Sequence, residues 1–303
     1  MTDLHKHLRG ERLREAVTGY VFILPWVLGF TVFFAGPIIA SFVLSFTQWS
    51  IVDTPQWIGM ANYRRIFTRD PDFYQALKVT LKYSTVYLPL EIILGITMAL
   101  VMNIKARGIG LYRTLLYLPY VVPAVAAVIV WIWVLSPYFG LLNYLLAKVG
   151  IHGPDWFGNP RYALWGIVMI SLWTVGGSAV IYLAGLQNIP PQLYEAAEID
   201  GASGWQQFWH ITLPMLSPTI FFKLVLGLIG TFQTFTSAFV ATRGGPMKST
   251  LFYMLYIYNK GFVSLQMGYA AALSWILTLI ILIITVLVFK SSPYWVHYEA
   301  ERK

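Results

Sequence analysis

Long uninterrupted runs of apolar residues dominate the pattern along the chain. Four segments contain no charged side chain: 16–52, 114–147, 162–194 and 261–289. A bilayer core about 30 Å thick requires about 20 apolar residues in a helix. The runs are continuous rather than alternating, which disfavours the strands of a membrane barrel. The pattern therefore predicts an all-α integral membrane protein.

Two further apolar stretches are each interrupted by a single charge, Glu91 in one and Lys223 in the other. Together the runs predict six transmembrane helices, at 17–45, 78–102, 113–136, 162–187, 217–241 and 268–290. We expect one membrane domain over residues 17–290. Residues 1–16 and 291–303 are then an N-terminal and a C-terminal tail.

Composition agrees with this class, since only 11% of the 303 residues are charged, against about 25% in a soluble domain. The net charge of +8 is interpreted as basic loops flanking spans, with no nucleic-acid partner. The chain has no cysteine, which excludes disulfides, thiol catalysis and cysteine-ligated metals. We assign no metal site and expect contact with membrane lipid.

Basic residues indicate the orientation. Lys6, Arg9, Arg12 and Arg14 precede the first predicted helix, and no basic residue follows that helix before Arg64. The positive-inside rule then places the N-terminus in the cytoplasm. Six crossings return the C-terminus to the same side.

One polar segment, residues 190–216, separates the fourth and fifth predicted spans and is called the polar hairpin below. Pro190 and Pro191 predict the start of a helix, and Gly201 predicts its left-handed end. Ser203 with Gln206 forms the pattern of a capping box for a second helix, which we expect to end near Leu213 before Pro214. Trp205, Phe208, Trp209 and Thr212 recur at helical spacing and predict one face, suited to the membrane interface. From physics alone, two interpretations remain: an ordinary interfacial connection, or a docking element for a soluble partner.

The sequence of this hairpin, EAAEIDGASGWQQFWHITLP, resembles the EAA loop of permease subunits in binding-protein-dependent ABC importers. The matching positions are Glu195–Ala197, Asp200–Ala202 and Ile211–Pro214. Three other regions resemble the sugar-permease branch: 57–67, 113–135 followed by 140–143, and 242–262. The last is similar to the "F"-type subunit of maltose transporters and to glycerol-phosphate permeases.

The resemblance implies a type I importer transmembrane domain with a cytoplasmic EAA coupling helix, in the inner membrane of a prokaryote. Its expected partners are a second permease, most simply in a heterodimer, a cytoplasmic ABC ATPase dimer and an extracytoplasmic solute-binding protein. The chain itself is expected to be non-catalytic, with ATP and Mg held by the ATPase. The resemblance assigns contacts with that ATPase to Glu195, Ala196, Ala197, Asp200, Gly201 and Ala202.

Two short segments contain hydroxyl, amide and glycine residues within predicted spans, as solute sites at the bilayer midplane often do. The candidates for the solute pathway are Gly176, Gly177, Gly230, Thr231, Gln233 and Thr234. Polar groups beside aromatic rings suit a sugar or oligosaccharide, and glycerol 3-phosphate is the alternative solute. Close packing of helices explains the same small residues.

Two points remain: the charged residues within the predicted spans, and the other classes of membrane protein that the sequence could represent. Glu91 is a candidate for a gating or ion-pair role, and Lys223 is expected to extend its amine to the inner membrane surface. A stand-alone secondary transporter needs an ion-coupling site, for which only Glu91 is available. No HExxH, GxSxG or paired-aspartate motif supports a membrane enzyme.

Overall fold

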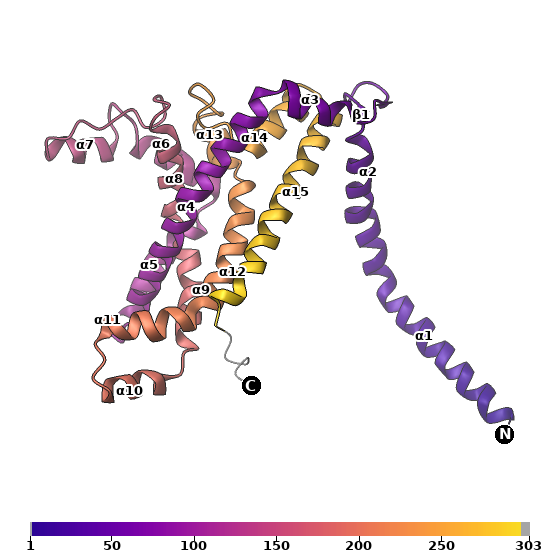
Figure 1. The fold of residues 1–303 in the computed structure, drawn as a ribbon, viewed down its shortest axis with the longest axis horizontal. Coiled ribbons are helices and arrows are strands. Elements are labelled where there is room, and N and C mark those ends of the chain that lie inside the picture. Colours follow the sequence, from indigo (N-terminus) through magenta and orange to yellow (C-terminus); the bar gives the residue numbers. More distant parts are fainter. Residues whose placement is uncertain (1, 298–303) are drawn as a thin grey trace. The chain divides into compact units, whose positions relative to one another are not determined.

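The computed structural model describes residues 2–297, and the side chains of Glu15 and of residues 17–297. Its α-helices are α1 Thr2–Phe30, α2 Gly36–Leu44, α3 Ala61–Arg69, α4 Pro71–Asn103, α5 Ile109–Val121, α6 Ala124–Val134, α7 Leu141–Lys148, α8 Ala163–Trp173, α9 Gly176–Gln187, α10 Pro191–Ile199, α11 Gly204–Gln207, α12 Leu213–Phe232, α13 Thr236–Ala241, α14 Tyr253–Tyr258 and α15 Met267–Ser291. Short π-helices lie at Thr31–Ala35, Phe208–Thr212 and Asn259–Val263, and a 3₁₀ turn lies at Ser292–Tyr294. Figure 1 shows them along the chain.

Within the described residues, four helical segments are long and apolar enough to cross a membrane: Val17–Leu44, Pro71–Asn103, Gly204–Ala241 and Met267–Tyr294. Two bent pairs pass the same test together. They are α5 with α6, bent by 98°, and α8 with α9, bent by 49°. The structure thus holds four to six candidate spans, depending on whether each bent pair is one crossing.

The predicted helices at 113–136 and 162–187 are therefore wrong as continuous helices. The first is interrupted before Ala124, because Val122 is extended and precedes Pro123, as the residue before a proline prefers. The second is interrupted at Thr174 and Val175. The predicted fifth helix is also broken, since α12 ends at Phe232 and α13 starts at Thr236. The first and last predicted spans match closely.

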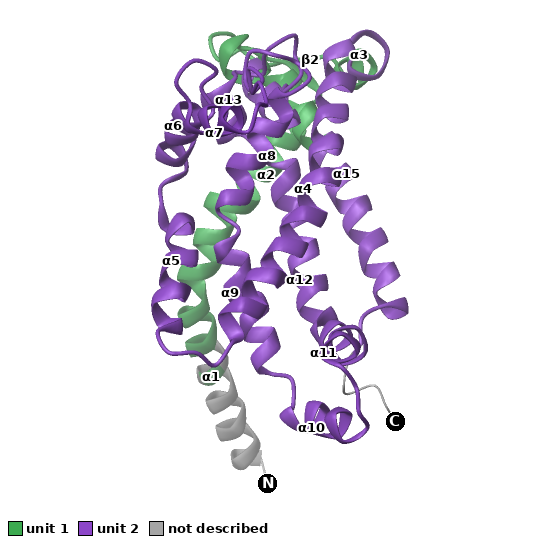
Figure 2. Cartoon of the chain, turned by 90° about the vertical axis from the view of Figure 1, so that its left-hand side faces the viewer, with its two compact units in different colours: residues 1–65, 260–275 green, residues 66–259, 276–303 purple. Residues whose placement is uncertain are grey.

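The chain divides into two compact units, coloured separately in Figure 2: residues 1–65 with 260–275, and residues 66–259 with 276–303. The first unit contains a short antiparallel pair, β1 (Thr47–Gln48) and β2 (Gln56–Trp57), with Thr47 opposite Trp57. Its buried Asn62 donates to the carbonyl oxygens of Ser45 and Thr47, both at 2.9 Å.

The second unit is organised around α4, which packs against α5, α8, α9, α12 and α14. α4 starts earlier than predicted because Asp70 caps it, accepting from the N–H groups of Asp72 and Phe73 at 3.1 and 3.2 Å, and Pro71 fits its first turn. At its other end, Arg113 donates to the carbonyl oxygen of Met102 at 2.9 and 2.8 Å.

Candidate functional site

The first limb of the polar hairpin is α10, which begins at Pro191 after Pro190. It ends in a Schellman turn: Gly201 has φ +77°, its N–H donates to Glu198 O at 3.1 Å, and the N–H of Ala202 donates to Ala197 O at 2.8 Å. Both the helix start and the left-handed glycine are confirmed.

The second limb begins with the predicted capping box. The Ser203 N–H donates to Gln206 Oε1 at 2.8 Å, and the Gln206 N–H donates back to Ser203 Oγ at 3.4 Å. The predicted helix end near Leu213 is wrong. α11 continues through the π-helix Phe208–Thr212 into α12, with the Leu213 N–H bonded to Phe208 O. Pro214 lies near the start of α12 but inside this continuous helix, so its missing N–H leaves a carbonyl oxygen of the preceding turn without a helical donor.

The two limbs are tied together and to the bundle. The hydroxyls of Tyr194 and Thr212 lie 2.9 Å apart. Tyr194, Phe208 and Ile211 pack on a buried apolar core built from α4, α9 and α12. The core residues are Ile96, Ala99, Met102, Ala179, Tyr182, Leu183, Leu186, Ile189 and Leu216. In Figure 1, α11 lies crosswise to α12 at this end of the second unit.

The opposite face of the first limb is open to solvent. The residues assigned to ATPase contacts are exposed (Glu195, Ala196, Asp200 and Gly201) or half-buried (Ala197 and Ala202). None of the hairpin's carboxylates has an ion-pair partner among the described side chains. Ile199, which the sequence analysis did not single out, is 87% exposed. This face is acidic, built from small residues, and carries one apolar side chain at its tip.

The solute-pathway candidates all lie beside the helix breaks. Gly176 and Gly177 begin α9, and Gln233 and Thr234 follow α12. A Cβ at Gly176 would overlap the carbonyl oxygen of Leu116, and a Cβ at Gly177 would overlap the ring of Tyr120. These two glycines therefore permit the close approach of α5 to α9.

The candidates on α12 differ in exposure. Thr231 is buried and accepts from the Ser84 hydroxyl at 2.8 Å. Gly230 and Gln233 are exposed and Thr234 is half-buried. A Cβ at Gly230 would meet no atom within 4 Å. Of the set, Gly230, Gln233 and Thr234 have room for a solute, whereas Thr231 joins α12 to α4.

A polar cluster that the sequence analysis missed connects both breaks to α4. The Tyr83 hydroxyl donates to Ser171 Oγ of α8 at 2.7 Å, and Ser84, the next residue of α4, donates to Thr231 of α12. The Tyr87 ring stacks on Tyr83 with centroids 5.2 Å apart. Hydroxyls beside aromatic rings are the groups that the sequence analysis associated with sugars.

The charges within the spans form an ion pair. Lys223 Nζ lies 3.4 Å from Glu91 Oε1, with the side chains only 13% and 4% exposed. The expectation that Lys223 extends to the membrane surface is therefore wrong. Glu91 Oε2 and the Tyr182 hydroxyl are buried without hydrogen-bond partners among the described residues. They are neighbours, because Gly95, one turn after Glu91, faces the Tyr182 ring.

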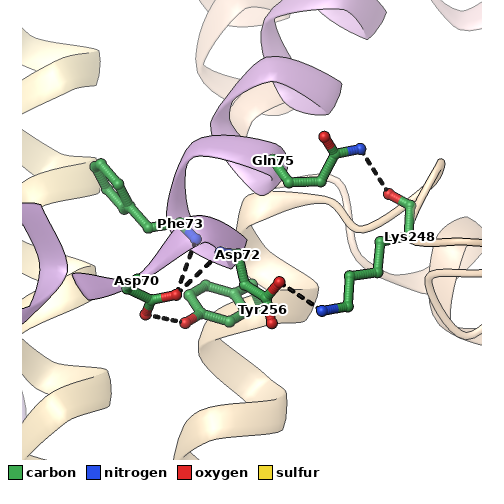
Figure 3. A network of polar contacts seen from close by, with 6 residues as sticks. All are labelled: Asp70, Asp72, Phe73, Gln75, Lys248 and Tyr256. Carbon is green, nitrogen blue, oxygen red and sulfur yellow. Dashed lines mark hydrogen bonds and ion pairs between the residues drawn. The ribbon is translucent and has the colours of Figure 1, made fainter. Parts of the chain in front are cut away.

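Residues 242–252, which contact the N-terminal end of α4, form a segment that we call the locked loop. Lys248 pairs with Asp72 at 2.5 Å and its carbonyl oxygen accepts from Gln75 at 3.1 Å (Figure 3). The Tyr256 hydroxyl donates to Asp70 Oδ2. The loop holds three non-glycine residues at positive φ, Arg243, Met247 and Lys248. Such backbone costs free energy, which the contacts to α4 offset.

Residues 91–293 match the family model described as "binding-protein-dependent transport system inner membrane component". The chain belongs to this family. The matched range includes the polar hairpin and every solute-pathway candidate, and it confirms the resemblance that the hairpin sequence carries.

Relatives match over most of the chain. The probable ABC transporter permease protein YesP of Bacillus subtilis is 42% identical, covering 99% of this chain and 98% of its own. The trehalose/maltose transport system permease protein MalF of Thermococcus litoralis is 34% identical, covering 82% and 84%. A solved bacterial alginate ABC transporter, in complex with an alginate pentasaccharide-bound periplasmic protein, contains a similar chain. The TM-score is 0.82 at 25% identity, covering 93% of this chain and 96% of that one.

The chain is thus a multi-pass membrane permease of the ABC importer class, mainly helical as predicted. Its relatives are transport subunits without catalytic roles of their own.

Proposed function

We propose that this permease forms, with a second permease, the pathway of an ATP-driven importer for a sugar or oligosaccharide. The polar hairpin is its handle for a cytoplasmic ATPase dimer, which binds ATP and Mg. An extracytoplasmic binding protein delivers the solute, and both termini of the permease are cytoplasmic. The proposal rests on one observation above all: an exposed acidic helix, α10, is joined by a rigid turn to a second limb that continues into α12.

This geometry suits force transfer. The small residues Ala196, Ala197 and Ala202 let a partner approach the backbone of α10. Glu195 and Asp200 offer charges for its hydrogen bonds, each worth about 1.5–3 kcal/mol. Because the second limb is continuous with α12, a pull on α10 moves the span that carries Gly230, Gln233 and Thr234. A bundle with two arrangements then alternates its access.

Two observations support a sugar or oligosaccharide as the solute. The open positions Gly230, Gln233 and Thr234 lie at the end of α12, which packs against α4, the helix that carries the stacked rings of Tyr83 and Tyr87. An aromatic face with hydroxyls and an amide suits the C–H and O–H surfaces of a sugar. Two of the three proteins named above carry trehalose, maltose or alginate in their names.

The test is reconstitution of the permease with its second permease, ATPase and binding protein in vesicles. We expect uptake of an oligosaccharide to require ATP, and Gln233→Ala to weaken uptake without changing assembly. Uptake by this chain alone, driven by an ion gradient, would refute the importer assignment. Uptake of glycerol 3-phosphate in place of sugars would refute the solute class alone.

A further inference from the structure

A basic pocket lies at the end of the second unit that carries the polar hairpin. A cavity of 560 Å³ opens between the end of α4, the start of α5 and the end of α9. Its charged lining residues are Lys105, Arg107 and Arg113, with the amides of Asn103 and Gln187 beside them, and no acidic side chain lines it. Gln187 ends α9 three residues before Pro190, so the pocket adjoins the hairpin.

The three cations are arranged for an anion. Arg113 is held in place by its two bonds to Met102 O, which use two of its five N–H groups. Lys105 and Arg107 are exposed and have no ion-pair partner among the described side chains. All three residues line the same cavity, which therefore carries positive charge with no acidic side chain to balance it. Guanidinium and ammonium groups together with amides are the donors that phosphate oxygens accept from.

Next to the pocket is an apolar stripe. Leu111, Leu115 and Leu118 recur at helical spacing on α5 and are 65%, 54% and 55% exposed. α5 is the first half of a bent candidate span, so the stripe runs from the pocket toward the membrane core. A soluble anion would need only the cations of the pocket, whereas a phospholipid would use both the cations and the leucine stripe.

We propose that this pocket binds the phosphodiester headgroup of an anionic phospholipid, with an acyl chain along the leucine stripe. Under the predicted orientation the pocket faces the cytoplasmic leaflet, where basic clusters attract anionic lipids. The lipid would join the ends of α4, α5 and α9 beside the hairpin. The proposal does not depend on which solute the permease carries.

The test uses the full-length permease, purified with its importer partners and placed in lipid nanodiscs. The probes are photoactivatable phosphatidylglycerol and, separately, photoactivatable phosphatidylcholine. Labelled sites are mapped by peptide mass spectrometry. The K105Q/R107Q variant removes two exposed charges from the pocket. The matched control, R69Q/K78Q, removes two exposed charges elsewhere in the second unit.

We expect phosphatidylglycerol to label residues 103–118. K105Q/R107Q should reduce that labelling about 25-fold, since each of the two basic residues near a membrane surface contributes about a fivefold factor in affinity. The control variant should label as the wild type does, and the charge-conserving K105R/R107K should restore labelling if the protein is intact.

Four results would overturn the proposal. Equal labelling by phosphatidylcholine would mean an ordinary lipid contact, and equal loss in the control variant would mean a bulk charge effect. Competition by inorganic phosphate at the same concentration as the lipid would mean a site for a soluble anion. Crosslinks from residues 105–118 to the second permease would mean a subunit interface.

Discussion

The polar hairpin and the locked loop are both connections between spans, but they are held in opposite ways. The locked loop is fixed to the start of α4 by an ion pair and a side-chain hydrogen bond, and Tyr256 of the following helix, α14, adds a bond to Asp70 (Figure 3). The hairpin rests on the other end of α4 through apolar contacts of Tyr194, Phe208 and Ile211. Directional polar contacts set one geometry, whereas apolar contacts are non-directional. The comparison indicates that a partner can displace the hairpin while the loop keeps its place.

Substitutions test this contrast by separating stability from coupling. Changes at the start of α4, where the locked loop is bound, and in the buried middle of α4 should lower the free energy of unfolding. Changes in the hairpin should lower that free energy less and reduce ATP-driven transport more. The predictions below run from the largest expected effect on stability to the smallest.

The ion pair in the middle of α4 should give the largest effect. Lys223→Met leaves the Glu91 carboxylate buried without its partner, at a cost of about 3–5 kcal/mol in unfolding free energy. The double variant Glu91→Gln/Lys223→Met should recover most of this loss. Thermal unfolding of all four members of the cycle in detergent measures it. A loss in the double variant equal to the sum of the two single-variant losses would show that the two side chains do not interact.

Asp70→Ala should give the next largest effect. It removes the α4 cap, worth about 1 kcal/mol, and leaves the buried Tyr256 hydroxyl short of an acceptor, which costs about 1–3 kcal/mol. Asp72→Ala is the matched control: it removes a partly exposed ion pair worth at most about 1 kcal/mol. The same unfolding assay compares them. A control as damaging as Asp70→Ala would contradict the described network.

Gly201→Ala sharpens the comparison within the hairpin. The φ of +77° costs a residue with a Cβ about 1–2 kcal/mol, and no atom lies within 4 Å of the added Cβ. The cost is therefore one of backbone conformation, and it falls on the turn between the limbs. We expect ATPase activity to lose its dependence on solute. Gly204→Ala, which also meets no atom within 4 Å, should behave as the wild type.

Glu195→Ala should have the smallest effect on stability, within about 0.5 kcal/mol, because the side chain is exposed. Loss of its contact with the ATPase should nonetheless reduce transport about tenfold or more. Uptake in vesicles and unfolding in detergent measure the two effects on the same samples. A large loss of stability with normal uptake would reverse the roles assigned to the hairpin.

Local rules predicted the hairpin well, whereas contacts distant in sequence were beyond them. Pro190 and Gly201 act through their own backbone, and Ser203 acts through a hydroxyl that reaches only three residues along the chain, so their roles follow from the sequence. The breaks after Trp173 and Phe232 depend on neighbouring helices, such as α5 against Gly176. The Glu91–Lys223 pair has a sequence signal, because these two opposite charges are alone in otherwise apolar spans; an ion-pair role was considered for Glu91, but Lys223 was not predicted as its partner. Three residues at the start of α4, Asp70, Asp72 and Gln75, contact Lys248 and Tyr256. These contacts join positions more than 170 residues apart in the sequence, and no local pattern predicts them.

The most direct measurement introduces single cysteines into this chain, which has none of its own. Ile199 on the hairpin and Met247 on the locked loop are both 87% exposed, so Ile199→Cys and Met247→Cys are matched for reactivity. Each variant is assembled with the ATPase and treated with a short thiol crosslinker. The account predicts a crosslink from position 199 to the ATPase and none from position 247. A crosslink from position 247, or none from position 199 in an assembled and active importer, would contradict it.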